Sequence, residues 1–524
     1  MGRPVSELRE EGRRASSGSV VQLRAGTIEG VRKVGVSVFL GVPYAQPPVG
    51  PLRFRRPVEC APWEGVRPAR TVGPIAHQFP TDLEAMQGRL DLPQSEDCLT
   101  LNIWTPEPDG TPRPVMVWIH GGAYLNGTGA ADWFDGTSFA TRHDVVLVTI
   151  NYRLAVFGYL HLAGVSPEEI GSGNCGLLDQ IAALQWVADN IASFGGDPGN
   201  VTVFGESAGA MSVGVILGTP EAAGLFHRAI LQSGAASNVT TAEDATAVAV
   251  AVLAALGLSP DVEGVTRLRE LPAAQIMAAY GAVAVSHAPD MTASRVVPTF
   301  APVVDGVVLP QEPLHAIREG ASSSVPVMIG TNRDEMEVMR LLDASIYDFG
   351  DDEIERRAAT LFGDLSGEAL SLYRRPEQRR TQNVWTAVDT DRTFLAPAIA
   401  LAEAHEAAGG ATWLYFFTWS TTAFGGRVGA VHTLEIPFVF NNFSLGASPE
   451  LTGGPPADAP ALGERMHRTW AHFARHGDPR NDGLPAWTPY EPLERATMIF
   501  DTTCAVVNDP QRDRRLLWNA WAER

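Results

Sequence analysis

The chain contains 524 residues, of which 45% are hydrophobic and 19% are charged, and these proportions are ordinary for a globular protein. Its formal net charge of −20 at pH 7 argues against functions that depend on a basic surface, such as binding nucleic acid or an anionic membrane. No stretch reaches the roughly 18 consecutive apolar residues that a membrane-spanning helix needs, so we expect neither a nucleic-acid nor a membrane partner.

The first predicted element is a polar leader at residues 1–17, which we expect to be disordered. It has no apolar core of the kind found in secretory signals, and this predicts a cytoplasmic protein. Residues 18–524 show no long linker or repeat, so we expect one domain. Four cysteines indicate no disulfide framework in a chain of this length, and no bridge can be assigned from their positions: Cys60, Cys98, Cys175 and Cys504.

Residues 75–95 show little periodicity and are expected to form a long surface loop. A loop of this length within a compact domain is usually functional or mobile. We therefore predict that it is a flap near the mouth of an active site.

Apolar strands alternate with helices along the rest of the chain. This alternation predicts an α/β protein with a mostly parallel sheet covered by helices on both faces. A strongly amphipathic helix is predicted at 177–194, and an alanine-rich core helix at 245–258 follows a helix-start signal at 241–244. The clearest strands are predicted at 115–119, 145–151, 201–204, 229–231, 325–329 and 413–419.

The first chemical motif, His120-Gly121-Gly122-Ala123, comes directly after a predicted strand. A tetrahedral intermediate carries a developing negative oxygen, and backbone N–H groups must face that oxygen with no side chain in the way. Consecutive glycines meet this need. We assign an oxyanion hole to the N–H groups of Gly121, Gly122 and Ala208.

The sharpest motif is Gly205-Glu206-Ser207-Ala208-Gly209, which follows the strand at 201–204 and leads into a helix expected at 208–217. This strand–turn–helix setting is that of the G-x-S-x-G nucleophile elbow, in which a tight turn exposes the serine hydroxyl above the sheet. The helix N-terminus then points at the reaction centre. Ser207 is therefore the candidate nucleophile.

A serine nucleophile needs a base and a carboxylate that orients the base. Among twelve histidines, His432 lies in a glycine-rich loop after the strand at 413–419, at the end of the sheet where α/β proteins collect their active sites. Three carboxylates follow the strand at 325–329, and spacing alone does not separate Asp334, Glu335 and Glu337.

With these motifs the chain resembles the type-B carboxylesterases, the family that includes bacterial p-nitrobenzyl esterases and the cholinesterases. The resemblance runs from about residue 20 to about residue 490. The segments that carry it, in chain order, lie at 41–54, 95–106, 120–123, 151–154, 174–180, 194–210, 232–234, 302–306, 330–335 (GTNRDE), 432–440 (HTLEIPFVF) and 473–479.

The resemblance implies an α/β-hydrolase fold with helical insertions and selects Glu335 as the acid and His432 as the base. Ser233 matches a serine that supports the acid from behind. The resemblance also implies two structural ion pairs and, because Ala76 stands where many relatives have a cysteine, a free thiol at Cys98. The two pairs are Arg53 with Glu96, and Arg153 with Asp179.

The activity implied is hydrolysis of carboxylic esters through an acyl-enzyme by a bacterial enzyme that needs no metal or cofactor, with small to medium apolar or aryl esters as substrates. The alternative is a hydrolase of the same fold whose natural substrate is a carbamate, an amide or a toxin ester. A third hypothesis is a non-catalytic binding protein of the same family. The sequence assigns no oligomeric state. Six aromatic residues are candidates for a substrate pocket or, equally, for core packing: Trp118, Tyr124, Trp133, Phe134, Phe424 and Phe438.

Overall fold

The computed structural model of the protein describes residues 18–88, 92–107, 109–287, 297–375, 383–454 and 458–524. The leader predicted at 1–17 lies outside these residues, as do residues 89–91 of the predicted flap. None of the helices in the described residues is long and apolar enough to cross a membrane.

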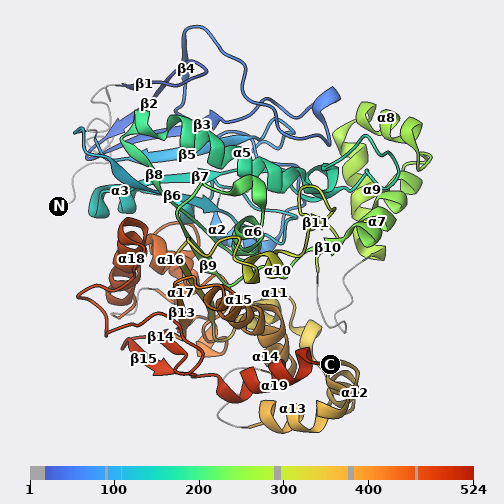
Figure 1. Ribbon diagram of the computed structural model, residues 1–524, viewed down its shortest axis with the longest axis vertical. Helices are drawn as coiled ribbons and strands as arrows, with labels where there is room; N and C mark the ends of the chain where they lie inside the picture. The colour runs from blue at the N-terminus through green and yellow to red at the C-terminus, as the bar shows by residue number, and fades with distance from the viewer. Residues whose placement is uncertain (1–17, 89–91, 108, 288–296, 376–382, 455–457) are drawn as a thin grey trace, which may run out of the picture.

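Thirteen strands in the described part of the chain form one large sheet, whose order is β1-β2-β3-β5-β7-β6-β8-β9-β12-β13-β14-β15 with β4 paired to β2 (Figure 1). Its centre, from β7 to β14, is entirely parallel, while the two margins are mostly antiparallel. The predicted α/β architecture with a mostly parallel sheet is therefore confirmed.

The central strands contain all six predicted strands, with ends that differ by a few residues. The strands of the large sheet are β1 (Gly18–Gln22), β2 (Thr27–Lys33), β3 (Val36–Pro43), β4 (Val66–Pro68), β5 (Thr100–Thr105), β6 (Arg113–Ile119), β7 (Val146–Ile150), β8 (Gly196–Glu206), β9 (Arg228–Gln232), β12 (Val327–Asn332), β13 (Thr412–Phe417), β14 (Ala496–Phe500) and β15 (Ala505–Asn508). A separate pair consists of β10 (Thr240–Thr241) and β11 (Val303–Val304).

The central strands read as unbroken apolar runs because both of their faces are covered. Along β6, Val115, Val117 and Ile119 pack into one hydrophobic cluster, whereas the alternating Met116 and Trp118 pack into a second cluster on the opposite face. Side chains of a strand point alternately to the two sides of the sheet, so every position of β6 is buried.

Helices cover both faces and also form two outlying groups (Figure 1). The helices are α2 (Asp82–Gln87), α3 (Thr137–His143), α4 (Ala155–Tyr159), α5 (Cys175–Asn190), α6 (Ala208–Leu217), α7 (Ala242–Ala255), α8 (Val262–Glu270), α9 (Ala273–Ser286), α10 (Pro313–Arg318), α11 (Glu337–Leu342), α12 (Asp351–Phe362), α13 (Ser366–Tyr373), α14 (Val384–Thr390), α15 (Ala396–Ala407), α16 (Ile436–Phe440), α17 (Ser448–Thr452), α18 (Ala459–His476) and α19 (Arg512–Ala522).

Helices α5, α6 and α15 pack on one face of the sheet, and α3, α16 and α18 pack on the other. The outlying groups are the predicted helical insertions: α7–α9 lie between β10 and β11, and α11–α14 lie between β12 and β13, followed by α15 on the sheet. The C-terminal α19 joins α12, α13 and α14 around a third hydrophobic cluster at one end of the molecule (Figure 1). Residues 75–95 are not a uniform loop, because α2 forms within them.

Candidate active site

Ser207 occupies a sharp turn between β8 and α6. Its backbone angles are φ 54° and ψ −126°, in a region that costs a non-glycine residue of order 1–3 kcal/mol. The turn is fixed from both sides. The backbone N–H of Ser207 donates to the carbonyl of Gln232 at 2.9 Å, and the backbone carbonyl of Ser207 accepts from the N–H of Met211 at 2.8 Å. Strain held in this way is typical of a functional position.

The glycines around Ser207 are required by close backbone approach. A Cβ atom on Gly205 would lie 2.6 Å from the carbonyl carbon of Gly209. One on Gly209 would collide with the carbonyl oxygen of Ile119, at the end of β6. The elbow therefore presses directly against the strand that precedes Gly121.

The three predicted oxyanion donors lie beside this turn. A Cβ atom on Gly121 would lie 3.1 Å from Cβ of Ser207, so its backbone is in contact with the serine. Gly122 has a φ of 105°, a conformation that favours glycine, and Ala208 begins α6, where N–H groups lack intrahelical acceptors. The structure thus gathers Gly121 and Ala208 at Ser207, with Gly122 next along the same glycine turn.

The residue before these glycines, His120, is a buried structural histidine. Its ring stacks on Tyr152 with centroids 4.5 Å apart, and the Tyr152 hydroxyl donates to the His120 carbonyl at 2.9 Å. Burial lowers the pKa of His120 to about 4, which keeps the ring neutral at physiological pH. His120 therefore supports the glycine turn from behind.

His432 and Glu335 form the predicted acid–base pair. Imidazole Nδ1 lies 2.7 Å from Oε2 of Glu335. The backbone N–H of His432 also donates to the backbone carbonyl of Glu335 at 3.2 Å. The other oxygen of Glu335, Oε1, accepts from the backbone N–H of Asn332 at 2.7 Å. With both oxygens engaged, the carboxylate can fix one orientation of the imidazole.

The other two acid candidates point elsewhere. Asp334 binds Arg333 and accepts from the N–H of Ala430 at 2.7 Å. Glu337 accepts from the Thr386 hydroxyl at 2.6 Å and pairs with Arg340 at 2.9 Å. Of the three carboxylates, Glu335 is therefore the one that contacts His432.

The second imidazole nitrogen faces a carboxylate that the sequence did not single out. Nε2 of His432 lies 3.1 Å from Oε1 of Glu206, the residue before Ser207, and among the described residues no hydrogen bond joins Nε2 to the Ser207 hydroxyl. Burial lowers the pKa of His432, but Glu206, Glu335 and the nearby Glu435 outweigh it and raise the pKa to about 9. The only indication of Glu206 in the sequence was its position inside the serine motif, directly before Ser207.

Behind the pair lies a buried polar network that sequence reasoning also missed. Glu435 accepts from Asn332 Nδ2 at 2.6 Å and from Gln232 Nε2 at 3.1 Å, while Gln232 Oε1 accepts from Trp470 Nε1 at 2.9 Å. Burial raises the pKa of Glu435. The spacing of Glu435, three residues after His432, was the only sequence signal for this network.

Ser233, predicted to support the acid, is fully buried with a φ of 53°. Its N–H donates to the carbonyl of Gly330 at 2.8 Å, but its hydroxyl forms no hydrogen bond with any described residue. The support of Glu335 visible in the structure comes instead from Asn332, so the role of Ser233 stays a prediction.

The two structural ion pairs are confirmed. Arg153 Nη2 lies 2.7 Å from Asp179 Oδ1, and Arg53 Nε lies 2.6 Å from Glu96 Oε2. Cys98 is a buried free thiol, and the other three cysteines are free as well. The described residues contain no cluster of three or more histidine, cysteine, aspartate or glutamate side chains able to hold a metal ion.

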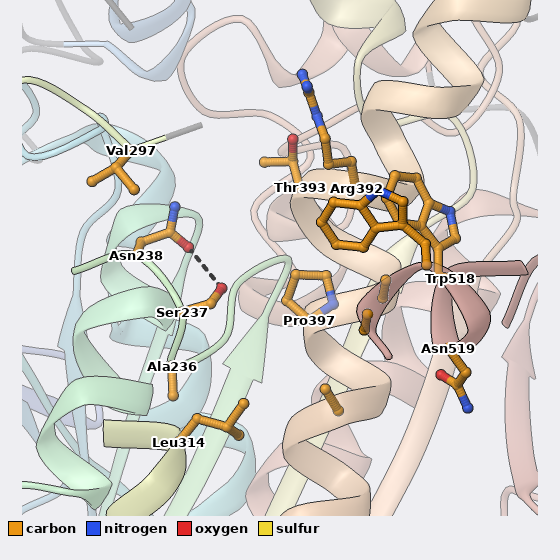
Figure 2. Close-up of a pocket in the computed structure, with 14 residues that line it drawn as sticks. Ala236, Ser237, Asn238, Val297, Leu314, Arg392, Thr393, Pro397, Trp518 and Asn519 are labelled. Atoms are coloured by element: carbon orange, nitrogen blue, oxygen red, sulfur yellow. Dashed lines mark hydrogen bonds between the residues drawn. The ribbon is translucent and has the colours of Figure 1, made fainter. Parts of the chain in front are cut away.

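Five of the six candidate pocket aromatics belong to the hydrophobic core, and Phe424 is 44% exposed. The aromatic residue that does contact His432 is Phe394, whose ring centroid lies 4.8 Å from that of the imidazole. A cavity of about 190 Å³ lies nearby, between α15, α19 and the loop at 236–238 (Figure 2). None of Ser207, Glu335 or His432 lines it.

The sequence model of the Carboxylesterase family matches residues 17–517. A para-nitrobenzyl esterase of Bacillus subtilis is 38% identical over 504 residues, which cover 95% of this chain and 97% of the relative. A phenmedipham hydrolase of Pseudarthrobacter oxydans is 36% identical over 502 residues, with 94% and 97% covered. The crystal structure of a Geobacillus stearothermophilus carboxylesterase superimposes with a TM-score of 0.84 at 39% identity, covering 95% of this chain and 99% of that one.

Proposed function

Because the chain belongs to the carboxylesterase family, has its α/β-hydrolase fold and is a carboxylic ester hydrolase, we propose that Ser207, His432 and Glu335 carry out the hydrolysis. The observation that carries this assignment is the 2.7 Å contact between His432 Nδ1 and Glu335, formed beside the strained turn that bears Ser207. A serine, an imidazole and a carboxylate in this relation are the parts of a serine hydrolase.

In the proposed mechanism, Nε2 of His432 takes the proton of Ser207 as Oγ attacks the ester carbonyl. The N–H groups of Gly121, Gly122 and Ala208 stabilise the developing oxyanion. Collapse of the intermediate releases the alcohol, protonated by His432, and leaves the acyl group on Ser207. Water activated by His432 then releases the acid.

Glu335 remains ionised throughout this cycle and stabilises the imidazolium. Because Nε2 contacts Glu206 at 3.1 Å in this structure, we propose that the Ser207 hydroxyl takes up its position at Nε2 when substrate binds. Catalytic hydrogen bonds are often long or poorly aligned before the substrate complex forms.

The proposed substrates are small to medium esters with apolar or aryl groups. The relative named for p-nitrobenzyl esters, which matches nearly the whole chain, supports these ester substrates. The relative named for phenmedipham, a carbamate, supports the alternative below. Apolar pockets distinguish neighbouring acyl lengths by only about 1–3 kcal/mol per methylene. A carbamate, amide or toxin ester as the natural substrate is the alternative, since the same serine chemistry attacks those carbonyls.

The assignment of Ser207 is tested by covalent labelling. A fluorophosphonate should attach to the tryptic peptide that contains Ser207 and abolish hydrolysis of p-nitrophenyl butyrate. Ser207→Ala should lose both labelling and hydrolysis, with circular dichroism unchanged. Ser212→Ala, in the helix that follows, is the matched control and should keep both. A label on another residue, or an active Ser207→Ala variant, would refute the assignment.

A substrate panel tests the preferred bond. Rates with p-nitrobenzyl and p-nitrophenyl esters are compared at one enzyme concentration with those of phenmedipham and matched aryl carbamates and anilides. Ester turnover should be the fastest by kcat/KM. A carbamate or anilide that exceeds every ester would favour the alternative.

We also propose that the enzyme acts in the cytoplasm on small molecules alone, without a nucleic-acid partner. The four free cysteines and the formal charge of −20 support this placement, because reduced thiols are usual in reducing compartments and an acidic protein repels phosphates. Fractionation of producing bacteria should recover the activity with a cytoplasmic marker, and recovery in the medium would overturn the proposal.

A further inference from the structure

Phe394 sits on an unusual piece of backbone. The stretch Asp391–Leu395 is a π-helix inserted between α14 and α15, and no other π-helix occurs in the described residues. Such turns are rare and are frequently found at functional sites. Here the turn presents the Phe394 ring to His432, with an angle of 35° between the ring planes. Both side chains are almost fully buried.

The first residue of this turn is tied to the C-terminal helix. Asp391 is fully buried and accepts a hydrogen bond from Arg514 of α19 at 3.2 Å and another from the Tyr373 hydroxyl at 2.5 Å. The Tyr373 hydroxyl in turn accepts from Trp518 of α19 at 2.8 Å. A charged pair at this depth is costly to bury, so packing alone does not account for its presence.

The turn also borders empty space. Thr393 and Pro397 line the 190 Å³ cavity, and Figure 2 shows Ser237 and Leu314 on its far side. Side chains that border empty space lose the dispersion contacts that would otherwise hold them. Two buried ion pairs therefore anchor the turn beside this space. Asp391 pairs with Arg514 of α19, and Arg392 pairs with Asp389 at 2.7 Å. Phe394 and Leu395 complete the anchoring by packing into the core.

We propose that Asp391 and Arg514 are positioning residues, whose buried ion pair holds the π-helical turn in place and thereby keeps Phe394 against the imidazole of His432. This inference rests on the proposed function, because it concerns the residue assigned as the base. Phe394 excludes water from one face of the imidazole and restricts rotation of the ring. Both effects keep Nε2 directed at the reaction centre in both chemical steps.

The expected effect is on kcat and not on KM. The ion pair acts on the orientation of His432, which moves the proton in both chemical steps, and not on the binding of substrate. A displacement of about 1 Å in reacting groups can lower a rate by up to 10²-fold. Removing both charges together avoids leaving one of them buried without a partner, so the variant should still fold. The amide that D391N introduces can still accept the hydrogen bond from the Tyr373 hydroxyl.

The test compares D391N/R514M with D509N/R515M, which removes the neighbouring ion pair of α19. Active enzyme is counted by fluorophosphonate titration so that kcat refers to folded sites only. D391N/R514M should lose about tenfold or more in kcat with KM little changed. D509N/R515M should keep kcat, although its melting temperature falls. Equal kcat in the two variants would overturn the positioning role.

The path through Phe394 is tested by a mutant cycle. Phe394→Leu alone should lower kcat, and adding D391N/R514M to it should cause little further loss, because both act on the same contact. If the two fold-losses in kcat multiply in the combined variant, the ion pair does not act through Phe394. If the fluorophosphonate does not label Ser207 in the unmodified enzyme, the proposed function itself fails; labelling with an unchanged kcat in D391N/R514M overturns only this inference.

Discussion

Imidazole Nδ1 of His432 lies 2.7 Å from Oε2 of Glu335, although 97 residues separate them in the chain. The contact is made possible by the sheet, because Glu335 follows β12 and His432 follows β13, and these strands are hydrogen-bonded neighbours. The pairing of Asn332 with Phe417 at the ends of the two strands brings the following loops together.

Replacing Glu335 tests the role of this contact. Glu335→Gln should reduce kcat for p-nitrophenyl butyrate by roughly 10³–10⁴-fold, because the amide cannot stabilise an imidazolium and can reverse the tautomer. Asp334→Asn is the control, since an asparagine can still accept from the N–H of Ala430. Steady-state kinetics should show a small change for Asp334→Asn. A similar loss in both variants would assign the effect to loop structure instead.

The pH profile depends on Glu206. His432 acts as a base only when neutral, so kcat/KM should rise with pH through the His432 pKa of about 9. Glu206→Gln removes a negative charge that raises this pKa, and the rising limb should therefore move to lower pH. Rates from pH 5 to 10 measure the shift, with the exposed Glu355→Gln as control. A rising limb that stays in place would contradict the coupling of Glu206 to His432.

Gly121 leaves no room for a side chain. In Gly121→Ala the new Cβ would lie 2.9 Å from the Glu206 carbonyl oxygen and 3.1 Å from Ser207 Cβ, so the glycine turn must move away from the serine. Loss of one oxyanion donor lowers kcat by about 10²–10³-fold. Gly367→Ala, where a Cβ meets no atom within 4 Å, should retain full activity. An active Gly121→Ala enzyme would exclude Gly121 as a donor.

Acid sensitivity of the fold should depend on His467, which is fully buried between Val439 and Ser138. Burial, aided by the nearby His143, lowers its pKa from 6.5 to about 3. A depressed pKa means that the stabilisation is complete above pH 6.5 and is lost as the pH falls towards the folded pKa. Between pH 6.5 and 5 this histidine should cost about 2 kcal/mol of unfolding free energy.

Urea denaturation of wild type and His467→Gln at the two pH values tests this. The glutamine does not titrate, so the variant should lose about 2 kcal/mol less than the wild type on acidification. His472→Gln, on the same helix but only partly buried, serves as the control. Identical pH slopes in wild type and His467→Gln would exclude His467 as a source of acid instability.

The sequence predicted the parallel centre of the sheet well, because strands buried on both faces leave long apolar runs such as residues 115–119 of β6. It did not reveal the antiparallel margin. Strand β2, for example, carries Glu29 between its apolar residues, ends in Arg32 and Lys33 and is only partly buried, so its signal is weak. Such a strand is stabilised by hairpin pairing with β1 and β3, which a weak apolar pattern does not signal.

The candidate site was predicted where a local motif exists, as at Ser207 and Gly121. Selection of Glu335 over Asp334 and Glu337 needed the family resemblance, because side-chain direction in an irregular loop depends on contacts such as the Asn332 N–H. For the contacts of His432 with Glu206 and Phe394, the sequence offered only the position of Glu206 inside the serine motif, and no pattern pointed to Phe394. These contacts arise from three separate segments that meet only in the folded protein.

The insertion of α11–α14 between two adjacent strands has a consequence for how this enzyme can diversify. The ladder of β12 and β13, and not the length of chain between them, sets the separation of the acid from the base. Long insertions add little loop-closure cost, about 0.6 kcal/mol for each doubling of length. Residues 343–372, which precede Tyr373 and α14, are therefore a region where segments can be exchanged to alter access and selectivity while the proton-transfer distances are retained.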